Sequence, residues 1–173
     1  MKRLFTFIAL TLAIALSCSV SAQSSKLIGE WNSSTGSQKA LLESIGGTIE
    51  KAKNTMTFNN DGTYATYSYV VASADLSGIK MRMLLELTEN GTWKYSDERV
   101  YMTSTNFDVI QIEISFDDPS MNAMSEEVIK VVIDAFKQGV GVELPLDVEF
   151  ISDNEVHLSF DSEYITFEYI LVR

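Results

Sequence analysis

The chain has 173 residues, with 24 acidic against 13 basic side chains and a formal net charge of −11. Such an excess of negative charge repels the phosphates of nucleic acids and the surfaces of anionic membranes, which argues against nucleic acid as a partner. One histidine and one cysteine provide no zinc-binding pattern, and the sequence holds no phosphate loop or nucleotide fingerprint, so we expect no metal site and no cofactor.

The first 22 residues predict an export signal. Lys2 and Arg3 form a positively charged start, residues 4–16 form an apolar stretch, and residues 20–22 (Val-Ser-Ala) form a small-residue cleavage site. The apolar stretch is shorter than the about 20 residues that a membrane span needs. Since no later stretch is apolar enough to anchor the chain, we expect no transmembrane span.

Cleavage after Ala22 leaves residues 23–173, which we expect to form one domain with 11 basic and 24 acidic residues, a net charge of −13. Cys18 leaves with the signal, so the exported chain has no disulfide and no thiol nucleophile. This favours a bacterial protein of the periplasm or the extracellular space. The alternative is a lipoprotein with Cys18 as its lipidated N-terminus, although Ala15 stands where such signals usually carry leucine.

Residues 55–69 predict the first hairpin of an antiparallel sheet. Two runs rich in threonine and aromatic residues flank Asn60-Asp61-Gly62, where Asp and Gly tolerate the positive φ that tight hairpin turns require. Later turn signals stand at 89–91, 96–98 and 152–154, and a short first strand is expected over 26–31.

Apolar side chains alternate with polar ones through most of the remaining chain, which indicates half-buried strands. The clearest alternation runs over 79–87. Further strands are expected over 64–71, 91–95, 99–105, 110–116, 146–151, 155–160 and 164–172.

Two segments have helical spacing instead. Residues 121–138 predict an amphipathic helix with Val128, Val132 and Phe136 on its apolar side, ended by Gly139. Residues 38–52 predict a shorter, imperfect helical segment. The whole pattern is typical of an all-β, mainly antiparallel fold of about 8–10 strands, and the short turns favour an up-and-down barrel over a Greek-key sandwich.

Three motifs resemble those of small secreted bacterial lipocalin-like proteins: Gly29-Glu30-Trp31, the hairpin from Phe58 to Tyr64 (F-x-x-DGTY), and Gly91-Thr92-Trp93-Lys94-Tyr95. The resemblance implies a lipocalin-like barrel in which a cation from the last strand packs on the tryptophan of the first. Arg173 stands at the expected place, and a guanidinium can lie on the face of an indole ring. The three strands expected after the helix over 121–138 depart from the family, whose helix normally follows the last core strand.

A pocket inside the barrel is the candidate binding site. Apolar and aromatic side chains on the cleanest strands are its candidate lining: Met81, Met83, Leu85, Trp93, Tyr95, Ile112 and Ile114. The same side chains would equally fill a barrel core, because small barrels are filled by their own interior side chains.

His157 is the one residue that suggests catalysis, with Ser159 and Asp161 on the same face of its strand. Side chains two positions apart on a strand are separated by about 7 Å, too far for a direct hydrogen bond, so we expect a polar residue on the solvent face and no enzyme. The predicted function is a secreted, non-enzymatic module that binds a small apolar or amphipathic ligand. The alternative is a structural or protein-interaction domain of the cell envelope with a filled barrel. An apolar void of a few hundred Å³ distinguishes the two.

Overall fold

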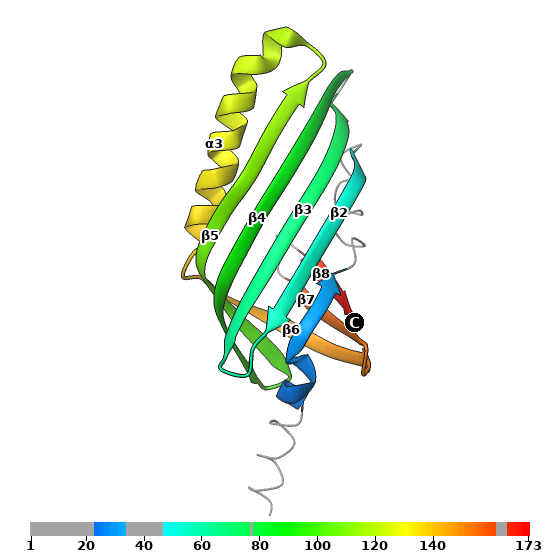
Figure 1. Cartoon of the computed structure of the whole chain (residues 1–173), viewed down its shortest axis with the longest axis vertical. Coiled ribbons are helices and arrows are strands. Elements are labelled where there is room, and N and C mark those ends of the chain that lie inside the picture. Colours follow the sequence, from blue (N-terminus) through cyan, green and yellow to red (C-terminus); the bar gives the residue numbers. More distant parts are fainter. Residues whose placement is uncertain (1–22, 34–46, 77, 162–165) are drawn as a thin grey trace, which may run out of the picture.

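The computed structural model describes residues 23–33, 47–76, 78–161 and 166–173. Eight antiparallel strands follow one another in chain order, and β1 pairs with β8 to close the ring (Figure 1). The predicted all-β, up-and-down barrel is confirmed. The predicted export signal over 1–22 lies outside the described residues.

The strands are β1 Gly29–Ser33, β2 Gly47–Phe58, β3 Thr63–Leu76, β4 Ile79–Ser96, β5 Arg99–Phe116, β6 Glu143–Ser152, β7 Glu155–Asp161 and β8 Thr166–Val172. Between β5 and β6 lie the 3-10 turn η1 (Pro119–Met121) and the helix α3 (Asn122–Gly139). Residues 23–27 form a short helix before β1.

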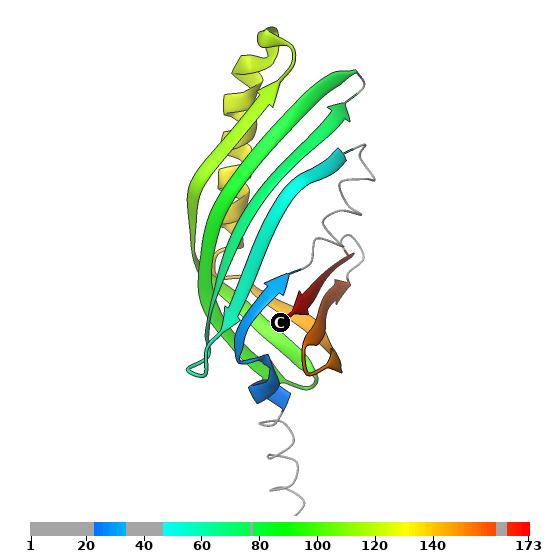
Figure 2. The same cartoon turned by 45° about the vertical axis from the view of Figure 1, so that its right-hand side comes forward.

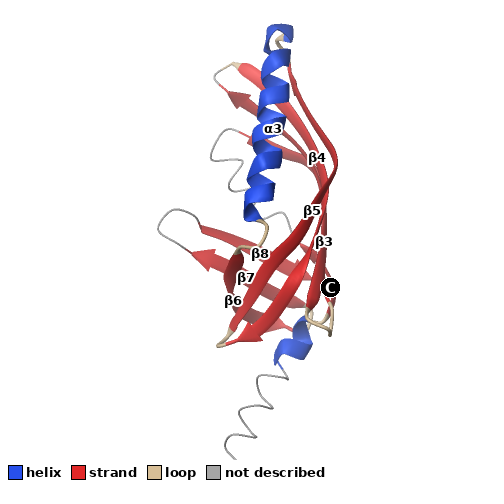
Figure 3. Cartoon of the chain, turned by 90° about the vertical axis from the view of Figure 1, so that its left-hand side faces the viewer, coloured by secondary structure: helices blue, strands red, loops and turns tan. Residues whose placement is uncertain are grey.

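Strands β2 to β5 are longer than the others, at 12 to 18 residues, and extend beyond the ring (Figures 1 and 2). Strand β5 has 18 residues but pairs with β6 only from Arg99 to Thr103. Beyond that point α3 runs beside β5, on the same side of the long strands as β6 to β8 (Figure 3). The molecule therefore has a closed part, which we call the lower barrel, and a four-stranded extension flanked by α3, which we call the upper sheet.

The turn predicted at 89–91 is wrong. These residues lie inside β4, which runs without interruption from Ile79 to Ser96, and the segments predicted as 99–105 and 110–116 are likewise one strand, β5. Register shifts between Glu86 and Leu87 and between Asn90 and Gly91 mark bulges at which the ladder continues. The turn predicted at 96–98 is confirmed, and Asp97 and Glu98 have φ values of 53° and 62°.

The helix predicted over 121–138 is confirmed as α3. Of the helical segment predicted over 38–52, residues 34–46 lie outside the described part, and the prediction is wrong for 47–52, which belong to β2. Gly47 pairs with Ala74 and Ile49 with Ala72, so pairing with β3 prevails over the local helical spacing. The first strand begins at Gly29 rather than at 26, because residues 26–27 belong to the short helix.

The lower barrel is filled by its own side chains. The largest ones without solvent exposure are Trp31, Phe58, Leu27, Leu146, Leu158, Leu171, Val100 and Val156. Leu27 comes from the short helix at the lower end of the ring, and its carbonyl accepts a hydrogen bond of 2.7 Å from the Trp31 indole Nε1. Within the described ranges, no helix has the length and apolarity to cross a membrane.

Candidate ligand site

Two adjoining cavities lie where the lower barrel meets the upper sheet. The first has a volume of about 290 Å³ and is bounded by strands of the sheet, by Ser33 of β1 and by Phe136 of α3. The second has a volume of about 270 Å³ and extends toward β6 and the residues that follow α3. Both are lined by Met56, Glu89, Phe107 and Tyr169. These volumes lie near the lower limit of small-molecule pockets.

Strand register explains why polar and apolar groups face these cavities together. Along β4 the side chains of Leu85, Leu87 and Glu89 point inward at intervals of two residues, and each lines the first cavity. Glu89 is paired with Thr66 on β3 and with Phe107 on β5. A carboxyl group thus stands in a row of otherwise apolar inner positions.

Hydroxyl groups from both neighbouring strands lie near Glu89. The buried Tyr64 hydroxyl donates to Glu89 Oε1 at 2.5 Å. Burial raises the pKa of the Glu89 carboxyl, while the nearby hydroxyl groups of Tyr64, Ser104 and Thr66 lower it. The pKa of the Tyr64 phenol is raised by burial and by its bond to Glu89. Burial also raises the pKa of Tyr169, with a further contribution from the charge of Glu89.

The remaining lining of both cavities is neutral and largely apolar. Among the described residues that line them there is no lysine, arginine or histidine. The arrangement therefore provides a largely apolar volume with one half-buried acid, three hydroxyl groups close to that acid and aromatic rings of Tyr169 and Phe107 in the shared wall. Such a site suits a ligand with an apolar body and one polar group.

All seven predicted pocket residues occupy inward-facing positions of β4 and β5, but only Leu85 lines either cavity. Met83 pairs with Ile114, and Leu85 with Ile112, in the upper sheet. Met81 lies further along the same face, where it borders a shallow hollow of the sheet. These residues cover the inner face of the upper sheet, beside the cavities.

Trp93 and Tyr95 lie at the opposite end of β4, in the lower barrel. The Trp93 ring meets Phe58 edge-on with centroids 5.1 Å apart, and its Nε1 donates to the Asn59 carbonyl at 3.0 Å. The Tyr95 hydroxyl donates to Gln23 Oε1 at 2.8 Å. Both side chains belong to the packing at the closed end, so the predicted set is divided between two regions of the molecule.

Sequence reasoning missed the central residue of the site. The sequence Glu89-Asn90-Gly91 predicts a turn, because Asn-Gly favours tight turns, and no local pattern connects Glu89 with Tyr64 or Ser104. One signal would have found it: the alternation that begins at Met81 continues without a change of phase through Glu89 and Gly91 to Trp93. A polar residue at an inner position of such a run indicates a site inside the barrel.

The residues of the predicted signature do come together. The Arg173 guanidinium lies over the Trp31 ring at 4.0 Å from its centroid, and Gly29 lies beside that guanidinium. The contact has the geometry that the resemblance implies.

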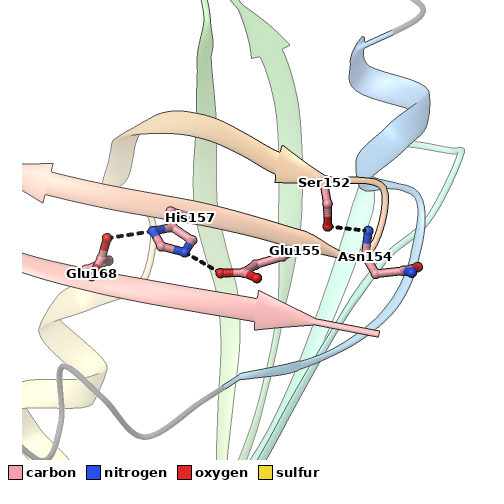
Figure 4. A network of polar contacts seen from close by, with 5 residues as sticks. All are labelled: Ser152, Asn154, Glu155, His157 and Glu168. Carbon is pink, nitrogen blue, oxygen red and sulfur yellow. Dashed lines mark hydrogen bonds and ion pairs between the residues drawn. The ribbon is translucent and has the colours of Figure 1, made fainter.

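His157 lies on the outer face of β7, away from the cavities. Its Nε2 is 2.9 Å from Glu155 Oε1 and its Nδ1 is 3.1 Å from Glu168 Oε1 on β8 (Figure 4). Glu155 stands two residues before His157 and still reaches it, because the glutamate side chain is long enough to span the about 7 Å between positions two apart on a strand. The hydrogen bond to Glu155 is the main cause that raises the pKa of His157, and Glu168 adds to it.

Carboxylates thus face both ring nitrogens of His157, and neither nitrogen is placed to take a proton from a hydroxyl nucleophile. Within the described part of the chain, no group of three or more His, Cys, Asp or Glu is arranged to hold a metal ion.

No family model matches this chain, and a search among curated proteins finds no significant match.

Proposed function

We propose that this protein is an exported, non-enzymatic, lipocalin-like module that binds a small apolar or amphipathic molecule in the two adjoining cavities. The observation that carries the proposal is the half-buried carboxyl group of Glu89 in a wall common to both cavities, of about 290 and 270 Å³. A filled barrel does not need a carboxyl group at an inner position, because withdrawing that group from water costs free energy that one neutral donor, the Tyr64 hydroxyl, offsets only in part.

The mechanism of binding would be the transfer of an apolar body from water into the space between the sheet and α3. Leu85, Leu87 and Phe136 supply the apolar wall, and Glu89 orients the polar end of the ligand. Since the lower barrel is filled, the ligand would lie at the junction with the upper sheet rather than deep in the ring.

The first experiment is native mass spectrometry of the chain from Gln23 to Arg173, purified after export, together with a solvent extract of the same sample. We expect a bound small molecule in a one-to-one ratio. A clean apo mass, combined with no thermal shift across a panel of fatty acids, sterols and amphipathic amines, would contradict the proposal.

A blocking variant locates the site. Ser68 lines the first cavity, so Ser68→Phe should fill it and abolish binding. The matched control is Ser115→Phe, which makes the same change at an exposed position of β5 that alternates with the inward-facing Ile114. Equal binding by both variants would place the ligand elsewhere.

A second candidate function is a cell-envelope interaction domain without a ligand. It is favoured by large apolar side chains that are exposed on α3 and just after it: Met124, Val131, Val140 and Val142. The exposed fraction is largest at Val131, 68%, and a partner docked along α3 would cover these side chains. Two results together would support this function instead: a mass without bound ligand, and a defined complex with a partner protein that Val131→Glu does not form.

A further inference from the structure

Glu89 is the only acid among the described residues that line the two cavities, and it belongs to both. Hydroxyl groups reach it from the two strands beside β4: Tyr64 and Thr66 come from β3 and Ser104 from β5, and all three are close enough to lower the pKa of its carboxyl group. A carboxylate with donors of this kind keeps lone pairs available for a further donor.

The donors around Glu89 are all neutral. No lysine, arginine or histidine stands among the described lining residues to balance the charge that Glu89 carries when it is ionised. Burial accordingly raises the pKa of its carboxyl group. A ligand that brings a positive charge would remove this cost, because a nearby cation favours the ionised form of an acid.

The surroundings of the site also favour a cation. Tyr169 and Phe107 line the shared wall with Glu89, and the face of an aromatic ring attracts a positive charge. The whole chain has a net charge of −11, a field that raises the local concentration of small cations and repels anions. Fatty acids and other carboxylates would meet a like charge at Glu89.

We propose that the ligand is a protonated amine attached to an apolar body, and that Glu89 is the residue that selects it. This inference rests on the proposed function and narrows its ligand class. The amine would lie between the Glu89 carboxylate and the ring faces of Tyr169 and Phe107, with its apolar body along Leu85, Leu87 and Phe136.

The test compares three probes with the same eight-carbon chain: octylamine, octan-1-ol and octanoate. Isothermal titration calorimetry at pH 7 with the wild-type chain should give tighter binding of octylamine than of octan-1-ol by about 10- to 100-fold, the range expected for one buried charged hydrogen bond. Octanoate should bind more weakly than either. This comparison needs no variant and therefore does not depend on the folding of one.

Glu89→Gln then assigns the selectivity to its residue. Glutamine keeps an acceptor for the Tyr64 hydroxyl but carries no charge, so the variant should lose the preference and bind octylamine no better than octan-1-ol. The matched control is Glu86→Gln. Glu86 stands on the outer face of the same strand and also accepts a hydrogen bond from a tyrosine, Tyr67, at 3.0 Å, so this variant should keep the preference for the amine.

Different outcomes separate this inference from the proposed function. Wild-type protein that binds octan-1-ol or octanoate as tightly as octylamine overturns the selection of amines and leaves a ligand-binding module. A preference for the amine that survives Glu89→Gln overturns the role of Glu89. If none of the probes binds, a co-purified molecule without a basic amine overturns the inference alone, and the absence of any co-purified molecule overturns both.

Discussion

The guanidinium of Arg173 lies over the indole ring of Trp31, with its central carbon 4.0 Å from the ring centroid. Its Nη2 also donates hydrogen bonds to the carbonyls of Lys26 at 3.0 Å and Ile28 at 2.7 Å. Gly29, which follows Ile28, has a φ of 122°, a conformation that favours glycine. The contact therefore joins the residue after β8 to the beginning of β1, next to the seam that closes the ring.

Arg173→Ala is expected to lower the free energy of unfolding by about 1–3 kcal/mol, because it removes both the stacking on Trp31 and two hydrogen bonds from a charged donor. Arg173→Lys should keep only part of the lost stability, since an ammonium group lacks the planar guanidinium that can stack on the ring and donate hydrogen bonds at the same time. Urea unfolding followed by tryptophan fluorescence measures both. Arg82→Ala, which removes a surface ion pair with Glu50, is the control and should cost less. Full stability of Arg173→Lys would show that charge alone is sufficient.

Gly91 is expected to tolerate no side chain. A Cβ at this buried position would lie 2.3 Å from the Thr103 carbonyl oxygen and 2.4 Å from Cε1 of Tyr64. Since a backbone oxygen of the neighbouring strand cannot move aside freely, Gly91→Ala should destabilise the barrel by about 1–3 kcal/mol. It should also displace the tyrosine that donates to Glu89.

Gly139→Ala is the control for this substitution. Gly139 is the last residue of α3, and a Cβ there would have no neighbour within 4 Å. Alanine in a helix is favoured over glycine, so this variant should be neutral or slightly stabilising. Thermal unfolding of Gly91→Ala and Gly139→Ala measures the difference between their melting temperatures. Equal melting temperatures would contradict the close packing of Tyr64 on Gly91.

Glu89 should make the stability of the apo protein depend on pH. Burial raises the pKa of Glu89 in the folded protein. Its contribution to the free energy of unfolding is therefore fully present below the pKa of a glutamate in the unfolded chain, about 4.3, and is lost as the pH rises through the folded-state pKa. Glu89→Gln lacks this loss. We therefore expect the melting temperature of Glu89→Gln to increase relative to that of the wild type as the pH rises above about 4.3.

Glu86→Gln measures the general effect of removing one negative charge from the same strand. The specific effect of burial is the difference between the two variants. A gap between Glu89→Gln and the wild type that is constant from pH 4 to pH 8 would contradict the burial of an ionisable carboxyl group in the cavity.

His157 should also make the stability depend on pH, but through ion pairs on the outer face of the barrel rather than through burial. Its pKa is raised by Glu155 first and by Glu168 in addition, so its favourable ion pairs are fully present below about 6.5 and are lost as the pH rises through the folded-state pKa. Because the groups are near the surface, the effect should be small and should weaken in high salt.

The measurement is the melting temperature between pH 5.5 and 8.5 in low salt. The melting temperature of His157→Gln should not fall in this way as the pH rises. The fall should be reduced more by Glu155→Gln than by Glu168→Gln, because the hydrogen bond to Glu155 is the main cause that raises the pKa of His157. The same slope in wild type and His157→Gln would mean that the contacts in Figure 4 have no energetic role.

Much of the fold could be predicted from local patterns. The alternation of apolar and polar residues from Met81 to Leu87 identified both a strand and its inner face, because successive side chains of a strand point to opposite sides whatever the strand packs against. The helix from Asn122 to Gly139 was equally visible in its apolar spacing. The segment from Gly47 to Ala52 was not, since its short apolar spacing suits a helix and a strand alike and pairing with β3 decided between them.

The sequence by itself determined that the chain would form an antiparallel barrel with a late helix, and which side chains of its clearest strands would face inward. Only the tertiary structure decided where the interior remains open and what lines it. Glu89 and Tyr64 are 25 residues apart, and they meet because β3 and β4 pair in a register that sets Tyr64 opposite Gly91 and Thr66 opposite Glu89, on a strand that continues past an apparent turn. Register and helix placement depend on the whole ring closing at once, so no local pattern contains them.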